Sequence, residues 1–222
     1  MTLLNRRSFT VGAATLAVLP AAPALASTVA RTFRVMRGTS QIGTHTVSVQ
    51  RLADGGRLAT SNIDIAVKGL GIITLYRYTL SCTETYDAQG NLVMMDGQCN
   101  DDGDAHYVNV NREGDTLMVS GSSYNGPTPL ASTGAASYWR KDNLAASPWI
   151  STQSGELLAV SASPISSSEA PAGATAYRVT NNTDYTIDVF YDSRGEWVGS
   201  AFDAKGERAT MQYLSETGAL QG

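Results

Sequence analysis

The chain has 222 residues, of which 42% are hydrophobic, 16% are charged and only 2 are cysteines, and its formal net charge at pH 7 is −4. These values exclude a disulfide-dense, a collagen-like, a compositionally disordered and a polytopic membrane protein, because each of those classes needs a bias that this composition lacks. A globular protein remains.

The N-terminal segment predicts export. Residues 5–12 contain the pair Arg6-Arg7, a polar residue and Phe9, and a short apolar run follows, so the segment resembles a twin-arginine signal. The apolar run is too short to span a bilayer. The small residues Ala24 and Ala26 suit a signal peptidase and predict cleavage before Ser27. We therefore expect a signal peptide over residues 1–26 and a single periplasmic domain over residues 27–222, with no transmembrane segment after cleavage.

The charge of the mature domain argues against two classes of partner. Cleavage would remove two of the 16 basic residues and none of the 20 acidic ones, which leaves an acidic protein. No basic stripe is visible along the sequence, so neither nucleic acid nor an anionic membrane surface is expected as a partner. Phosphate-binding loops and dinucleotide fingerprints are absent from the sequence, and no cofactor is predicted.

The mature chain is expected to be an all-β meander. From residue 33 onward, turn dipeptides recur between runs of roughly 6 to 12 residues rich in Val, Ile, Thr and Tyr. Alternation with a period of two is visible, for example at Ile63 and Ile65. Links this short join only antiparallel neighbours. We predict an antiparallel up-and-down sheet of about ten or eleven strands that curls into a barrel or half-barrel around its apolar face.

Residues 124–155 form an irregular insert in this meander. Pro127 and Pro129 interrupt the strand pattern, and the run over residues 137–144 predicts a short helix. The insert also carries Trp139 and Trp149, two large apolar side chains that need burial. Two arrangements fit: the insert caps an open end of the barrel as a lid, or it packs outside as a belt.

The two cysteines fall in neighbouring predicted strands, and in an oxidising compartment such a pair is usually bonded. If Gln89-Gly90 is a two-residue turn, Leu80 lies opposite Cys99, and Cys82 and Cys99 are diagonal neighbours on one face. If the loop has three residues, they point to opposite faces. The apolar alternation favours the same face, so a Cys82–Cys99 disulfide is expected, with two buried thiols as the alternative.

The only histidines are His45 and His106, and each is in phase with apolar residues of its strand. Their rings should therefore point to the concave side of the sheet. They would either orient a ligand or move a proton there, or serve as structural groups that bond to their neighbours.

Signals for catalysis or metal binding are weak. Two histidines from distant strands lack the third ligand that a zinc site needs. The acidic run over residues 100–104 lacks the spacing of a calcium loop and is better explained as a solvated hairpin turn. A Gly-x-Ser-x-Gly motif is absent from the sequence. No catalytic residue and no metal site are predicted.

Several short stretches together resemble a known family. They are residues 42–45, 76–78, 101–103, 137–139, 152–158, 189–192 and 197–198. In their order and number they resemble an uncharacterised family of exported bacterial proteins, a domain of unknown function, over nearly the whole mature chain. The resemblance implies a periplasmic β-rich domain without established activity. In outline, the meander is also similar to curved-sheet carriers of lipoproteins and glycolipids and to lipocalins, which is an analogy of fold alone.

These observations favour a periplasmic binding or carrier protein for an apolar or amphipathic small molecule in the concave face, unless side chains fill that interior. Two alternatives remain: an envelope interaction module that offers a sheet edge or the Trp149 region to a partner protein, and a hydrolase or isomerase that uses His106 with a nearby carboxylate. The expected lining residues are His45, Val47, Ile63, Ile65, Tyr76, Tyr78, His106, Val108, Tyr138 and Trp139.

Overall fold

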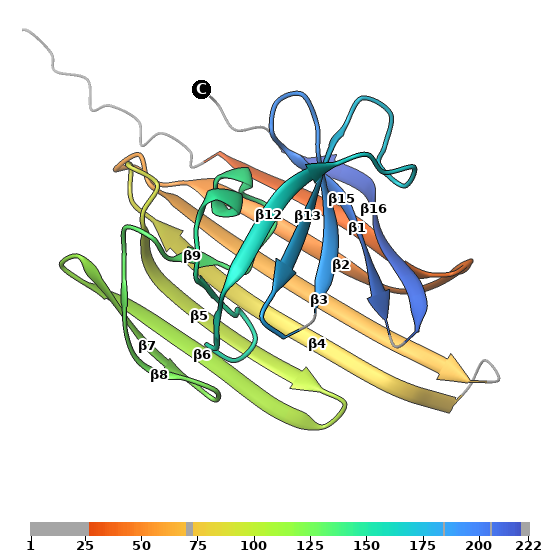
Figure 1. Cartoon of the computed structure of the whole chain (residues 1–222), viewed down its shortest axis with the longest axis horizontal. Helices are drawn as coiled ribbons and strands as arrows, with labels where there is room; N and C mark the ends of the chain where they lie inside the picture. The colour runs from red at the N-terminus through yellow and green to blue at the C-terminus, as the bar shows by residue number, and fades with distance from the viewer. Residues whose placement is uncertain (1–26, 70–72, 184, 205, 219–222) are drawn as a thin grey trace, which may run out of the picture.

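The computed structural model describes residues 27–69, 73–183, 185–204 and 206–218 (Figure 1). The expected signal peptide, residues 1–26, lies outside the described residues.

Thirteen strands of the described chain form one antiparallel sheet. The first eight are β1 (Thr28–Arg37), β2 (Ser40–Arg51), β3 (Arg57–Gly69), β4 (Ile73–Tyr86), β5 (Leu92–Asp101), β6 (Asp104–Glu113), β7 (Thr116–Gly121) and β8 (Asn125–Pro129). The other five are β12 (Val160–Ile165), β13 (Thr175–Asn181), β14 (Thr186–Tyr191), β15 (Trp197–Ala204) and β16 (Glu207–Thr217).

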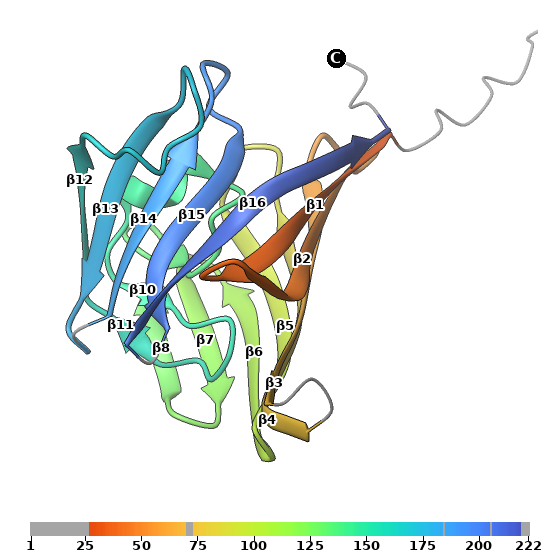
Figure 2. The ribbon, with the colours of Figure 1, turned by 90° about the vertical axis from the view of Figure 1, so that its right-hand side faces the viewer.

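The sheet is the expected meander, with thirteen strands in place of about ten or eleven. Its order is β12-β13-β14-β15-β16-β1-β2-β3-β4-β5-β6-β7-β8, so each strand pairs with its neighbour in the chain and the last strand pairs with the first. Figure 2 shows the sheet curling around itself. The edge strands β8 and β12 do not pair with each other, and the barrel is therefore not closed.

The acidic run at the end of β5 forms a hairpin turn. Asp102 and Gly103 both have positive φ, at 55° and 106°, as a tight turn between twisted strands requires. The side-chain oxygen of Asn100 accepts a hydrogen bond of 2.9 Å from the Gly103 N–H. These side chains thus shape the connection between β5 and β6.

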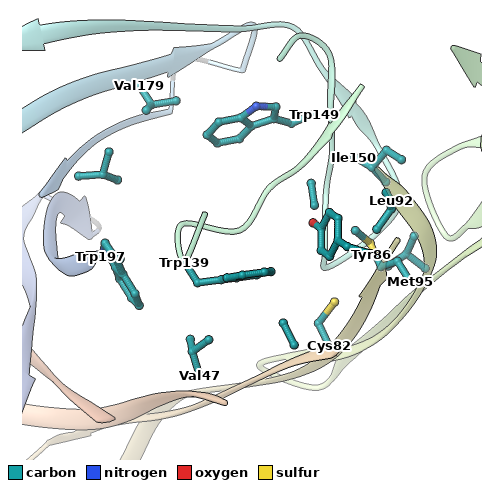
Figure 3. Packing of buried hydrophobic residues seen from close by; sticks show 14 of the residues in the cluster. Val47, Cys82, Tyr86, Leu92, Met95, Trp139, Trp149, Ile150, Val179 and Trp197 are labelled. Carbon is teal, nitrogen blue, oxygen red and sulfur yellow. The ribbon is translucent and has the colours of Figure 1, made fainter. Parts of the chain in front are cut away.

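The irregular segment between β8 and β12 takes neither of the two expected positions. It contains the short strands β9 (Gly134–Ala135), β10 (Trp149–Ile150) and β11 (Leu157–Leu158) and the 3₁₀-helix η1 (Lys141–Ala145), which fulfils the prediction of a short helix. We call residues 130–159 the plug, because this segment runs through the concave side of the sheet. Figure 3 shows the indoles of Trp139 and Trp149 projecting from the plug into the interior.

Glycines of the sheet make room for the plug. A Cβ at Gly97 of β5 or at Gly121 of β7 would stand well inside van der Waals contact of the plug backbone at Thr152 and Ser154. The plug also reaches the opposite wall, because the Tyr191 hydroxyl donates to the backbone carbonyl of Tyr138 at 3.0 Å. The interior is thus packed with protein, and open space remains at the end of the sheet where β2 ends and β3 begins.

The expected disulfide is not formed, and Cys82 and Cys99 are both buried free thiols. The β4–β5 register pairs Leu80 with Cys99 and Cys82 with Gly97, so the cysteines are diagonal neighbours on the concave face. Diagonal neighbours lie about 7–8 Å apart, beyond the Cα separation that a disulfide usually spans. The prediction that the two cysteines lie on the same face is confirmed, and the prediction that they form a disulfide is wrong.

Among the residues that the structure describes, no helix combines the length and the apolar character needed to cross a bilayer.

Candidate functional site

A hollow of about 530 Å³, which we call the main hollow, opens at one end of the curled sheet. Six apolar side chains form its floor: Val29 and Phe33 of β1, Val47 and Val49 of β2, Trp139 of the plug and Trp197 of β15. Charged side chains surround its opening: Arg31, Arg57, Arg140, Lys141, Asp142, Arg194 and Glu196. The hollow is therefore apolar at its base and charged at its rim.

Ring contacts fix the floor of the main hollow. The rings of Phe33 and Trp197 pack with centroids 4.0 Å apart. The Trp197 indole N–H donates to the Gly199 carbonyl at 2.8 Å, which sets the orientation of the ring. Phe33 and Trp197 are buried almost completely, so the floor is preformed.

His45 supports this floor from beneath. Its ring centroid lies 5.1 Å from that of Trp197, its Nε2 is 2.7 Å from the Ser61 hydroxyl, and its Nδ1 is 3.4 Å from the Met211 sulfur. Burial lowers the pKa of His45 to about 3, so the imidazole is neutral at physiological pH. Both ring nitrogens have partners inside the protein. This arrangement fits the structural role, which was one of the two alternatives that the sequence allowed for His45.

A buried carboxyl group holds Trp139 in place. Glu84 of β4 is 1% exposed, and its Oε2 accepts hydrogen bonds from the Tyr86 hydroxyl at 2.5 Å, the Ser137 hydroxyl at 3.0 Å and the Trp139 indole at 3.4 Å. Burial raises the pKa of Glu84, while these hydrogen bonds lower it in part. Glu84 thus ties the plug to the sheet at one wall of the main hollow.

A second hollow, of about 400 Å³, adjoins the main one. It is lined by Arg51, Gly55, Arg57, Tyr86, Asp87, Ala88, Gln89, Gly90, Arg140 and Asp142, and it shares Arg57, Arg140 and Asp142 with the main hollow.

Arg140 stands at the junction of the two hollows. Its guanidinium carbon lies 4.3 Å from the Tyr86 ring centroid and 5.8 Å from that of Trp139. Its Nη1 donates to the Gly90 carbonyl at 2.8 Å. Packing and hydrogen bonding together fix the position of this cation.

Of the ten residues expected to line a pocket, Val47 and Trp139 line the main hollow. His45 lies beneath it, and Tyr138 packs its ring 6.1 Å from that of Trp197. Val108 is buried in the core against the plug near Gly155.

The other five expected residues lie on the concave side nearer the opposite end. Ile63 pairs with His45 across β2 and β3, and Ile65 pairs with Tyr78 across β3 and β4. His106 is half-buried opposite Cys99, with three strands between it and His45. Tyr76 lies ten residues before the hollow end of β4, which is about 33 Å of extended strand. The structure thus separates these residues from the main hollow.

The cationic rim is what the sequence analysis missed. Arg57 and Arg194 come from a strand and a turn far apart in the chain, and no local spacing links them. One signal was visible: Arg140 and Lys141 directly follow Trp139. Trp149, expected as an interaction surface, is 3% exposed, and its indole donates to the Asn143 carbonyl at 2.8 Å.

These features define a class of protein: an all-β, beta-barrel-like domain whose curled sheet encloses a plug and leaves a hollow at one end. The chain belongs to the family described as domain of unknown function DUF6134, whose model matches residues 33–213. The resemblance to an uncharacterised domain family is therefore confirmed.

The fold is shared with a solved structure. The chain is similar to a beta-barrel-like protein of the domain of unknown function DUF1849 from Brucella abortus, with a TM-score of 0.58 and 9% identity over 87% of this chain and 98% of that chain. At this identity the likeness shows the fold alone. No curated protein matches the chain.

Proposed function

We propose that this chain is a periplasmic binding or carrier protein for an amphipathic small molecule, which it holds in the main hollow. The observation that carries the proposal is the main hollow itself, which opens at one end of the sheet and has six buried or half-buried apolar side chains at its base and charged side chains at its rim. A volume of about 530 Å³ falls within the range of small-molecule sites, which is about 300–1,000 Å³.

The rigidity of the floor supports binding. Phe33 and Trp197 are held by the contact between their rings, and Trp139 is held by its hydrogen bond to Glu84. A preformed site loses little conformational entropy when a ligand enters, and more of the apolar burial is then available as affinity.

Binding is tested with the neutral apolar dye N-phenyl-1-naphthylamine, whose fluorescence rises in apolar surroundings. Val49 lines the main hollow and is half-buried, so Val49→Trp places an indole in the open space. Met118→Trp adds the same group on β7, where the native side chain is 36% exposed. We expect saturable dye binding by the native protein and by Met118→Trp, and loss of binding in Val49→Trp.

Equal dye binding by all three proteins would place the dye elsewhere, and no binding by the native protein would remove the proposal. Circular dichroism checks that Val49→Trp is folded. The smaller Val49→Phe substitution provides a second test if it is not.

The periplasmic address is part of the proposal and follows from the paired arginines of the N-terminal segment. Fractionation of cells that produce the full chain should place the mature protein in the periplasm. The double variant Arg6→Lys, Arg7→Lys should retain the precursor in the cytoplasm, and export of this variant at the native level would contradict the twin-arginine route.

A further inference from the structure

The end of the curled sheet that carries the two hollows has a charge opposite to that of the chain. Six cationic side chains line the hollows, and we call them the basic mouth: Arg31, Arg51, Arg57, Arg140, Lys141 and Arg194. Three acidic side chains line the same hollows, Asp87, Asp142 and Glu196. The whole chain carries a formal charge of −4. A net positive opening on an acidic protein attracts anions.

Two of the three acidic groups are neutralised by arginines. Glu196 pairs with Arg31, and Asp87 pairs with Arg112 at 2.7 Å. The third, Asp142, lies 3.4 Å from Arg140 but has a side chain that is 87% exposed, so water screens this pair. Two cations of the mouth have further acidic partners outside the hollows, because Arg31 also pairs with Glu216 at 2.6 Å and Arg194 pairs with Asp192 at 3.1 Å. The positive charge that the acidic groups leave uncancelled therefore lies at Arg57, Arg140 and Lys141.

Two arginines face each other directly within the basic mouth. Arg51 of β2 and Arg57 of β3 are register partners, and Tyr86 of β4 is the next residue in the same row. Like charges directly opposite each other across two strands are destabilising. Arg57 lines both hollows, and it forms no ion pair or side-chain hydrogen bond with residues in the described part of the chain. A bound anion would provide Arg57 with a partner of opposite charge.

Arg140 of the plug contributes a second cation to the two hollows beside Arg57. Its side chain is 13% exposed and is held by the Tyr86 ring and the Gly90 carbonyl, with Arg57 lining the same two hollows. A guanidinium has five N–H donors in a planar fork that matches carboxylate and phosphate oxygens. The fixed position of Arg140 therefore provides a prepared site for such a head group beside the apolar floor.

We propose that the ligand of the main hollow is a long-chain molecule with an anionic head group, a carboxylate or a phosphate. The apolar chain enters the main hollow beside Val49, the half-buried side chain of its floor, and the head group binds between Arg57 and Arg140. This proposal rests on the proposed function and adds to it the charge of the ligand.

The experiment compares four ligands that share one alkyl chain: decanoate, decyl phosphate, decanol and decyltrimethylammonium. Their affinities for the mature protein are measured by quenching of tryptophan fluorescence at low and at high salt. We expect the two anions to bind roughly tenfold more tightly than decanol, because a charged hydrogen bond adds to the same apolar contact, and to lose this advantage at high salt. The cation should bind most weakly. The stronger of the two anions shows whether the head group is of the fatty-acid or the phospholipid type.

Arg57→Gln tests the placement of the head group, and Arg34→Gln is its matched control, because Arg34 is exposed on β1 and does not line the hollows. Arg57→Gln should reduce the affinity for both anions roughly tenfold and leave decanol binding unchanged. Arg34→Gln should change neither.

The outcomes separate the two proposals. Binding of decanol with an affinity equal to that of the anions would overturn the anionic head group and keep the proposed function. Absence of binding by all four ligands would count against the proposed function itself. Anion binding that survives Arg57→Gln unchanged would remove the head group from the Arg57–Arg140 site.

Discussion

The carbonyl oxygen of Thr152 lies directly over Gly97, so that a Cβ at Gly97 would stand well inside van der Waals contact of it. The close approach allows the plug to lie flat on the sheet. Without it, the plug would be pushed toward the opposite wall and away from the residues that form the main hollow.

We predict that Gly97→Ala destabilises the protein by about 2 kcal/mol, because the added methyl forces a rigid backbone segment to shift. Urea unfolding gives the free energy, and the near-ultraviolet circular dichroism of the buried tryptophans reports the displacement of the plug.

Gly173→Ala serves as the control for Gly97→Ala. Gly173 has a φ of 78° in a loop with nothing within 4 Å of the added methyl, so this change carries only the backbone cost of about 1 kcal/mol. It should leave the near-ultraviolet spectrum intact. An altered spectrum in Gly173→Ala, or an unaltered one in Gly97→Ala, would contradict the role assigned to Gly97.

The meander could be predicted from the sequence, because the signals that indicate strands and turns lie within short stretches of the chain. Alternation with a period of two placed Val47 and Val108 on the concave face, and the dipeptide Asp102-Gly103 marked a tight hairpin. These signals depend on residues next to each other in the chain.

The site could not be predicted in the same way, because it depends on contacts between distant residues. Strand β16 pairs with β15 on one side and with β1 on the other, which brings Trp197 of β15 next to Phe33 of β1, and no spacing in the sequence encodes that contact. The path of the plug depends on Gly97 of β5 and Gly121 of β7. In the sequence alone, a glycine within a strand pattern indicates only a weakened or interrupted strand. Arg57 and Arg194 become neighbours of one hollow only after the sheet has curled.

The free thiols lead to a second prediction. Burial raises the pKa of Cys82, and burial likewise raises that of Cys99, so both cysteines remain protonated and unreactive. In protein prepared without reductant, we expect no thiol to react with iodoacetamide in the native state and both to react in urea.

A disulfide would leave both cysteines unmodified in urea as well, and that result would contradict the free-thiol geometry. Protein treated with reductant before unfolding is the control, because it must show two reactive thiols in either case.

The buried carboxyl of Glu84 leads to a third prediction. Removing its side chain leaves the Tyr86 hydroxyl, the Ser137 hydroxyl and the Trp139 indole without their acceptor. Glu84→Ala should therefore destabilise the protein by about 3 kcal/mol or more. Ser200→Ala is the control, because the Ser200 hydroxyl is buried without a hydrogen-bond partner in the described structure, and its loss should cost less.

The raised pKa of Glu84 also fixes the sign of a pH effect. A carboxyl whose pKa is higher in the folded state contributes most to stability below its unfolded pKa, and loses this contribution as the pH rises through the folded value. Glu84→Gln does not titrate. The free energy of unfolding of the native protein should therefore fall relative to that of Glu84→Gln between pH 4 and pH 8. A constant difference would show that Glu84 ionises as easily in the fold as in water.

His45 leads to a fourth prediction, of opposite sign. Burial lowers its pKa to about 3, from an ordinary value of 6.5, so the unfolded chain binds a proton more readily than the folded protein does. The contribution of His45 to stability is complete above pH 6.5 and is lost as the pH falls toward 3. His45→Leu keeps an apolar side chain beneath Trp197 and removes the titration.

The native protein should therefore lose about 2 kcal/mol relative to His45→Leu between pH 7 and pH 5. Other titrating groups cancel in this difference, and His106→Leu is the matched control because His106 is half-buried rather than enclosed. Urea unfolding at several pH values measures the difference. If the difference in unfolding free energy between the native protein and His45→Leu did not change with pH, the ring would accept a proton inside the fold. His45 would then be available for proton transfer, which its contacts with Ser61 and Met211 argue against.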